Sequence, residues 1–159
     1  MAFSRRVEII PLQRSITGQT GQSTFSAPQS SDETMIAEVG PEPTFELFCH
    51  RRQTDQLMVL RGAIDLILLQ EGRLRRLRLR EDEGAWVRIP PGVPHGAINR
   101  GRSPALIVNA VLRHGPHDPR DYRPRPIPAA LLVDLQAIKA EADIVNNLDV
   151  LRTVPKIRG

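Results

Sequence analysis

The segment Gly84–Asn99 constrains the fold of this chain more than any other part of the sequence. It follows the pattern G-x5-P-x-G-x2-H-x3-N, in which the histidine is His95. The apolar run Ala85–Ile89 predicts a strand, and the Pro-Pro-Gly sequence after it ends that strand because proline cannot donate to a central ladder. The turn redirects the chain, so we expect His95 to begin the next strand and to point into a β-barrel.

The region around this segment also has a β pattern. Short β-type runs alternate with turn signals at intervals of about 8–12 residues, as in a sandwich or barrel. Gly72 tolerates a positive φ, which makes Gln70-Glu71-Gly72 a predicted hairpin turn. The expected strands are Thr44–His50, Gln56–Arg61, Ala63–Leu69, Arg73–Arg80, Ala85–Ile89 and Ala105–Leu112.

The strand after the hairpin has a break in its alternation. Leu74 has the same parity as the arginines at 76 and 78, whereas Leu77 and Leu79 face the other way. A β-bulge near Arg75 would bring the leucines to one face, so we predict one there.

The segments on either side of the barrel differ in composition. Residues 1–33 form a predicted N-terminal arm, in which Val7–Leu12 could be a short strand and Ser15–Ser31 is expected to be exposed and weakly ordered. The barrel itself is expected at 34–115, and a connector at 116–128 is too rich in proline for a helix or a central strand. Residues 129–150 have the apolar period of an amphipathic helix.

Composition excludes several classes of function. The net charge is +4, but the basic residues are scattered and there is one Trp and one Tyr, so we expect no nucleic-acid binding. No apolar run reaches the roughly 20 residues of a membrane span, and Met1–Gln13 has no apolar core of a signal peptide. The single cysteine, Cys49, excludes an intrachain disulfide, and a cytoplasmic location is expected.

The pattern at Gly84–Asn99 resembles the second motif of the cupin superfamily. The first motif of that superfamily, G-x5-H-x-H-x3-4-E-x6-G, is partly present, with His50 as its second histidine, Asp55 in place of the glutamate and Gly62 as the closing glycine. Phe48 stands where the first histidine would be, and Glu42 stands at the leading glycine. The resemblance implies an all-β fold: a single cupin (double-stranded β-helix, or jelly-roll) barrel with the arm before it and the helix after it.

This resemblance leaves the presence of a metal open. His50, Asp55 and His95 are the candidate ligands, and two imidazoles with a carboxylate suit a weakly held divalent ion such as Fe, Mn, Ni or Zn. The alternative is that these are inherited barrel positions filled by hydrogen-bonded polar groups. Phe48 removes one nitrogen ligand and adds bulk beside the site.

The chain is also similar to the dTDP-4-keto-sugar epimerases and ketoisomerases, in Gln56–Leu69, in Ile89–His95 and in Arg120-Asp121-Tyr122. This similarity implies proton transfer next to a ketone, with His50 as base and His95 as a second catalytic group. Tyr122 is either an acid or a surface anchor, and Asn109 either lines the cavity or is a hydrogen-bonded core residue. A non-catalytic protein that binds or senses a small ligand is the alternative class. The arm and the helix predict a homodimer.

Overall fold

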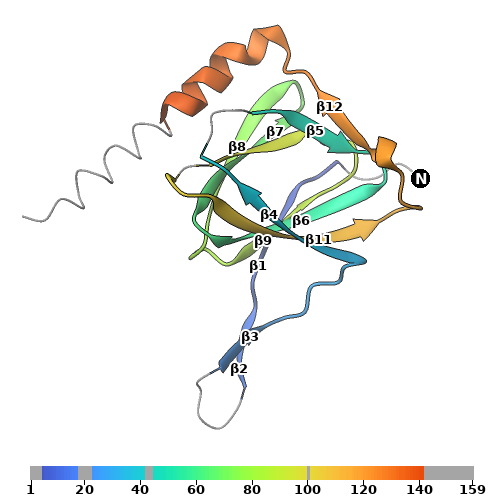
Figure 1. Ribbon diagram of the computed structural model, residues 1–159, viewed down its shortest axis with the longest axis vertical. Helices are drawn as coiled ribbons and strands as arrows, with labels where there is room; N and C mark the ends of the chain where they lie inside the picture. The colour runs from blue at the N-terminus through green and yellow to red at the C-terminus, as the bar shows by residue number, and fades with distance from the viewer. Residues whose placement is uncertain (1–4, 18–22, 42–44, 100, 142–159) are drawn as a thin grey trace, which may run out of the picture.

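The computed structural model describes residues 5–17, 23–41, 45–99 and 101–141, and most of them lie in antiparallel strands (Figure 1). One five-stranded sheet has the order β1-β9-β6-β11-β4. Its strands are β1 (Glu8–Pro11), β9 (Ala85–Ile89), β6 (Gln53–Arg61), β11 (Ala105–Arg113) and β4 (Glu33–Val39). The second has the order β12-β5-β10-β7-β8. Its strands are β12 (Tyr122–Arg125), β5 (Leu47–His50), β10 (His95–Asn99), β7 (Ala63–Gln70) and β8 (Arg73–Arg80).

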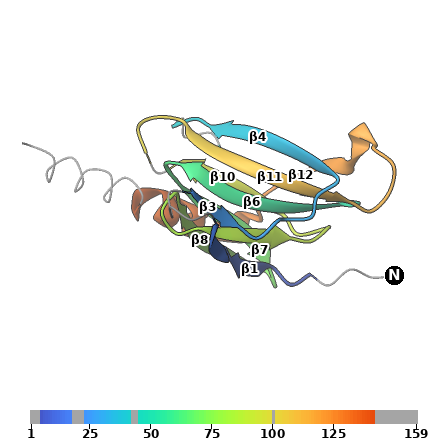
Figure 2. The same cartoon turned by 90° about the horizontal axis from the view of Figure 1, so that it is seen from below.

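The two sheets enclose an apolar core, as expected from strands that alternate inward and outward residues. In the turned view, β4 runs along one side of the barrel and β7 and β8 along the other (Figure 2). Branched aliphatic side chains from both sheets fill the space between them, and Trp86 packs with Val108 and Ala110 in a smaller cluster. The main cluster is Val59, Ile64, Leu66, Leu68, Leu79, Val87, Ile89, Val93, Ala105 and Ile107. The predicted all-β class is confirmed.

The hairpin predicted at Gln70-Glu71-Gly72 is present, with φ of 52° at Glu71 and 71° at Gly72. The bulge predicted near Arg75 is wrong, because β7 and β8 pair without interruption from Ala63↔Arg80 to Gln70↔Arg73. Both faces of β8 have partners. Leu79 is buried in the core, and on the opposite face Arg76 and Arg78 reach Glu141 at 2.6 and 3.3 Å.

The Pro-Pro-Gly turn ends β9 as the sequence predicts, and Gly92 adopts a φ of 78°. The Gly92 amide donates to the carbonyl oxygen of His50 over 2.6 Å. Because His50 ends β5 and His95 begins β10, this bond joins the turn to the neighbouring strand and brings the two histidines to the same end of the barrel.

The flanking segments carry more regular structure than their composition predicts. In the arm, β2 (Arg14–Thr17) pairs with β3 (Ser23–Ser26) in a hairpin that extends from the barrel (Figure 1). Of the segment predicted to be weakly ordered, residues 18–22 lie outside the described residues. In the connector, β12 is an edge strand, where Pro124 removes no needed ladder bond.

The C-terminal helix follows a short 3-10 turn, Ala129–Leu131, and covers 132–141; its predicted continuation to 150 lies outside the described residues. Leu135 of this helix is buried. In the part of the chain that the structure describes, no helix is long and apolar enough to cross a membrane.

Candidate functional site

The three polar residues singled out from the motifs come together inside the barrel. His50 lies at the end of β5, Asp55 lies in β6 of the facing sheet, and His95 opens β10. The Asp55 Oδ2 atom is 3.0 Å from Nε2 of His95 and 3.6 Å from Nε2 of His50. One carboxylate therefore faces two imidazoles.

His95 is held at both of its ring nitrogens. It is 4% exposed; its Nδ1 lies 2.9 Å from the carbonyl oxygen of Val93, and its Nε2 lies 3.0 Å from Asp55. Both ring nitrogens of His95 therefore already have an oxygen partner, and neither points to an open position.

Asp55 is an ionised carboxylate at the centre of a hydrogen-bond network. Its Oδ1 accepts from Gln53 Nε2 over 2.5 Å and from Asn109 Nδ2 over 2.8 Å. Burial on its own raises the pKa of Asp55, but the hydrogen bond from His95, the charges of His95 and His50, and the bond from Asn109 together lower it to about 2. The carboxylate is negatively charged near neutral pH and stabilises a positive charge on either histidine.

His50 is placed differently from His95, because neither of its nitrogens is within hydrogen-bonding distance of a carboxylate. Its Nε2 is 3.6 Å from Asp55 Oδ2, and its Nδ1 is 3.7 Å from Asp121 Oδ2. Burial is the largest influence on its pKa and lowers it below 6.5, against the opposite effect of Asp55. The imidazole is therefore neutral at pH 7 and has a nitrogen available to accept a proton.

Asp121 is the residue of this site that sequence reasoning did not assign. It is 8% exposed, and its Oδ1 accepts hydrogen bonds from the backbone amides of Arg51 and Arg52, each over 2.9 Å. These bonds fix the carboxylate with Oδ2 toward His50. Neither Asp121 Oδ2 nor His50 Nδ1 has a hydrogen-bond partner among the described residues, so a small approach would join them. Asp121 lies in the Arg120-Asp121-Tyr122 run, and that run is the sequence signal for it.

Two aromatic rings form the wall beside His50. Phe48 stacks on Tyr122 with ring centroids 4.9 Å apart, and it also contacts His50 and His95 at centroid distances of 5.6 and 4.6 Å. The Tyr122 hydroxyl donates to Glu46 Oε2 over 3.2 Å. Partial burial, then the bond to Glu46 and its charge, raise the pKa of Tyr122, so its hydroxyl stays protonated at neutral pH.

The arrangement does not fit a metal centre. His95 directs its Nε2 to Asp55 rather than to an open position, both Asp55 oxygens already accept bonds, and Phe48 packs against both imidazoles. Across the described ranges, no group of three or more His, Cys, Asp or Glu side chains has an arrangement that could hold a metal ion. We therefore derive no step through a metal, and a weakly held ion stays a prediction to be measured.

The other candidates take structural roles. Asn109 bridges two chain segments, because its Oδ1 accepts from the Gln56 amide while its Nδ2 donates to Asp55. It is thus a hydrogen-bonded core residue that also holds the site. Trp86 is 8% exposed and packs in a core cluster.

Comparison with known proteins identifies the fold. No protein-family model matches the sequence, and no curated protein matches it. Among solved structures, a dTDP-sugar isomerase from Desulfovibrio desulfuricans aligns with a TM-score of 0.59 at 24% identity, over 78% of this chain and 86% of that one. A mutant 3,4-ketoisomerase from Thermoanaerobacterium thermosaccharolyticum, in complex with TDP-4-keto-6-deoxyglucose, aligns at 0.58 and 15% identity, over 76% and 88%.

A dTDP-4-dehydrorhamnose 3,5-epimerase from Bacillus anthracis, with TDP and PPi bound, aligns with a TM-score of 0.53 at 14% identity, over 73% of this chain and 76% of that one. The fold is thus the cupin barrel of the kind found in sugar-nucleotide isomerases and epimerases, and the predicted single cupin barrel is confirmed. Fold alone does not assign the reaction, which must be argued from the site.

Proposed function

We propose that this protein is a carbohydrate isomerase or epimerase of the cupin type, which moves a proton next to the ketone of a keto-sugar. The observation that carries the proposal is the position of His50, a neutral, partly buried imidazole between the carboxylates of Asp55 and Asp121. The structural similarity to ketoisomerases and epimerases supports the same class of reaction.

The chemistry needs only a group that accepts a proton and returns it. His50 takes the proton from the hydroxyl-bearing carbon beside the ketone, the C–H electron pair forms a carbon–carbon double bond, and the carbonyl oxygen takes a proton from solvent to give an enediol. When a proton returns to the former carbonyl carbon and the hydroxyl on the neighbouring carbon releases its proton to solvent, the ketone moves by one position. When a second donor returns a proton to the original carbon on the opposite face and the former carbonyl oxygen releases its proton to solvent, that centre is inverted. Atoms and electrons balance in both cases without an oxidant or reductant.

The two carboxylates explain how His50 can hold the proton between these steps. A protonated imidazole carries a positive charge that burial disfavours, and Asp55 and Asp121 offset this cost from opposite sides of the ring. Asp121 is a positioning residue, because it acts through the imidazole. His95 keeps Asp55 ionised and in place, so in this proposal its role is also to position rather than to accept the proton.

The competing function is binding of a small ligand without turnover. The experiment that separates the two is incubation of the full chain with a panel of nucleotide-linked 4-keto sugars, with the products followed by NMR. We expect a shifted ketone or an inverted centre with the wild-type protein and none with His50→Asn. His117→Asn is the matched control, since His117 is exposed and no hydrogen bond or ion pair joins it to His50, Asp55 or Asp121 in the described part of the chain, and it should retain activity. Binding of the whole panel without a new product would favour the binding function.

A further inference from the structure

Two residues that the proposed mechanism does not use, Gln53 and Arg113, connect Asp55 to the rim of the barrel. Gln53 begins β6 and Arg113 ends β11, and the two pair directly across the ladder. Gln53 is 4% exposed, and its Nε2 donates to Oδ1 of Asp55 over 2.5 Å. On the other side of the same amide, Nη1 of Arg113 donates to Oε1 of Gln53 over 2.7 Å. Arg113, Gln53 and Asp55 thus form a hydrogen-bonded relay.

The charges at the two ends of the relay decide which way the Gln53 amide points. A guanidinium group only donates hydrogen bonds, and an ionised carboxylate only accepts them. With Oε1 toward Arg113 and Nε2 toward Asp55, both contacts are attractive, whereas the flipped amide would make both of them repulsive. Arg113 therefore holds Gln53 as a donor to Asp55, and hydrogen bonds of this charge-assisted kind are about twice as strong as neutral ones.

Arg113 is itself held in place by the start of β4. Its Nε and Nη2 atoms donate to the two carboxylate oxygens of Glu33 over 3.0 and 2.6 Å, and its backbone amide donates to Asp32. The hydrogen bond from Arg113 is the largest influence on the pKa of Glu33 and lowers it, so Glu33 is ionised at neutral pH. A two-point contact of this kind fixes the plane of the guanidinium group, which leaves Nη1 directed at Gln53.

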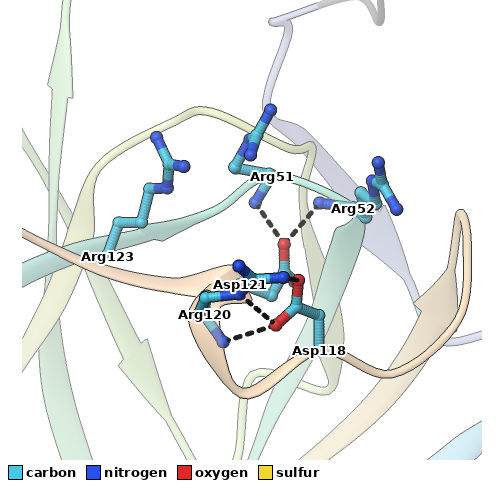
Figure 3. A pocket seen from close by; sticks show the side chains of 6 residues that line it. All are labelled: Arg51, Arg52, Asp118, Arg120, Asp121 and Arg123. Carbon is cyan, nitrogen blue, oxygen red and sulfur yellow. Dashed lines mark hydrogen bonds and ion pairs between the residues drawn. The ribbon is translucent and has the colours of Figure 1, made fainter.

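Asp55 depends on this support more than the other carboxylate of the site does. Asp121 accepts two hydrogen bonds from backbone amides, which the strand and the following turn hold in place (Figure 3). At Oδ1 of Asp55, the donors in the described part of the chain are both side chains, Gln53 and Asn109. These two bonds leave Oδ2 for the two imidazoles. Loss of the Gln53 bond would allow the carboxylate to turn about its Cβ–Cγ bond and would move Oδ2.

We infer that Gln53 and Arg113 are positioning residues of the reaction: Arg113 acts through the Gln53 amide to fix the oxygen that Asp55 presents to the two imidazoles. The inference rests on the proposed function, because it concerns how Asp55 stabilises the positive charge that His50 takes up. Neither Gln53 nor Arg113 contacts the substrate in this account. The competing role is direct contact of Arg113 with an anionic part of the substrate, which kinetics distinguish from positioning.

The kinetic test is a double-mutant cycle in the conversion of a nucleotide-linked 4-keto sugar at pH 8, where His50 is neutral. We expect Gln53→Leu and Arg113→Met each to lower kcat by about tenfold and to change KM by less than about twofold. Because Arg113 acts through Gln53, the double variant should be no slower than Gln53→Leu. Arg113→Lys, which keeps the charge and a donor, should recover part of the rate. A raised KM in Arg113→Met, or losses that multiply in the double variant, would overturn the inference.

The matched control is Thr54→Val, at the neighbouring buried position of β6. Thr54 faces away from Asp55 because side chains alternate along a strand, and its hydroxyl is 2.7 Å from Nε2 of His114. Its replacement removes a hydrogen bond from the same strand, so urea unfolding should show a loss of stability, but kcat should stay at the wild-type value. A loss of kcat in Thr54→Val as large as in Gln53→Leu would reduce Gln53 to a structural residue.

NMR of the side-chain amide of Gln53 tests the relay without a substrate. In the wild type, the amide proton bonded to Asp55 should exchange slowly with solvent and resonate downfield. In Arg113→Met it should move upfield and exchange faster, whereas in Thr54→Val it should not change. An unchanged signal in Arg113→Met would overturn the inference even if the protein converts the sugar. Absence of conversion by the wild type, with this change of signal present, would refute the proposed function but not the orientation of Gln53 by Arg113.

Discussion

Replacement of His95 by glutamine tests the ion pair that organises the site. Glutamine can still donate one neutral hydrogen bond to Asp55, but it removes the positive charge that keeps this buried carboxylate ionised. The pKa of Asp55 lies at about 2 rather than 3.8, even though burial opposes the ionised form. At about 1.4 kcal/mol per pKa unit, this shift is equivalent to roughly 2 kcal/mol of net stabilisation. We therefore expect His95→Gln to lower the free energy of unfolding at pH 5 by about 2 kcal/mol or more.

The lowered pKa of Asp55 also predicts how the stability difference between the two proteins changes with pH. Because the pKa of Asp55 is lower in the folded protein, the unfolded chain binds the proton more readily than the folded one. The stabilisation that Asp55 adds to the free energy of unfolding is therefore complete above pH 5 and is lost as the pH falls toward 2. In the wild type, about 1 kcal/mol of it is lost by pH 3. In His95→Gln the pKa of Asp55 rises and this loss disappears, so the stability difference between the two proteins should shrink by about 1 kcal/mol from pH 5 to pH 3.

Urea unfolding followed by the fluorescence of the single tryptophan, the buried Trp86, measures both quantities. The control is His117→Gln, an exposed histidine that is no part of the Asp55 network; it acts only weakly on Glu33, so its replacement should leave the stability and its pH dependence close to those of the wild type. The reasoning is refuted if His95→Gln is as stable as the wild type at pH 5, or if the difference stays constant down to pH 3.

Three further predictions concern the reaction and the metal. Asp121→Asn should slow sugar conversion by about tenfold or more while leaving the fold intact, because it keeps the acceptor for two backbone amides but loses the charge beside His50; an unchanged rate would exclude Asp121 from the mechanism. The rate should fall on acidification with a midpoint below pH 6.5, because burial lowers the pKa of His50; a midpoint above that value would contradict this. Metal analysis of protein purified without an affinity tag should find well below one ion per chain, and treatment with a chelator should leave activity unchanged; tightly held metal in full complement would show that His50, Asp55 and His95 are ligands after all.

The features that the sequence predicts correctly are local. The Pro-Pro-Gly turn and Gly72 are recognisable because proline and glycine limit the backbone directly, and they place the ends of β9, β10 and the β7–β8 hairpin. His50, Asp55 and His95 occupy the motif positions that were expected to face the barrel interior, on strands of both sheets. The strands Glu33–Val39 and Tyr122–Arg125 were not expected. They lie at sheet edges with mostly exposed side chains, so their sequences lack the alternation of apolar and polar residues that marks a half-buried strand.

The features that the sequence does not predict depend on distant contacts. Arg76 and Arg78 look misplaced on a strand until the C-terminal helix brings Glu141 onto that face. Asp121 reaches the site only because β12 pairs with β5, and it bonds to Arg51 from 70 residues away. The orientation of His95 depends on contacts with Val93 and Asp55 together, which no spacing rule reveals.

Exchange of solvent deuterium into a nucleotide-linked 4-keto sugar tests the central claim most directly. Proton abstraction by His50 exposes the proton to solvent, so mass spectrometry should find deuterium at the carbon beside the ketone after incubation in heavy water with the wild-type protein. His50→Asn should bind the sugar nucleotide with little change and incorporate none. Incorporation by His50→Asn at the wild-type rate, or binding by the wild type without any exchange, would contradict the account.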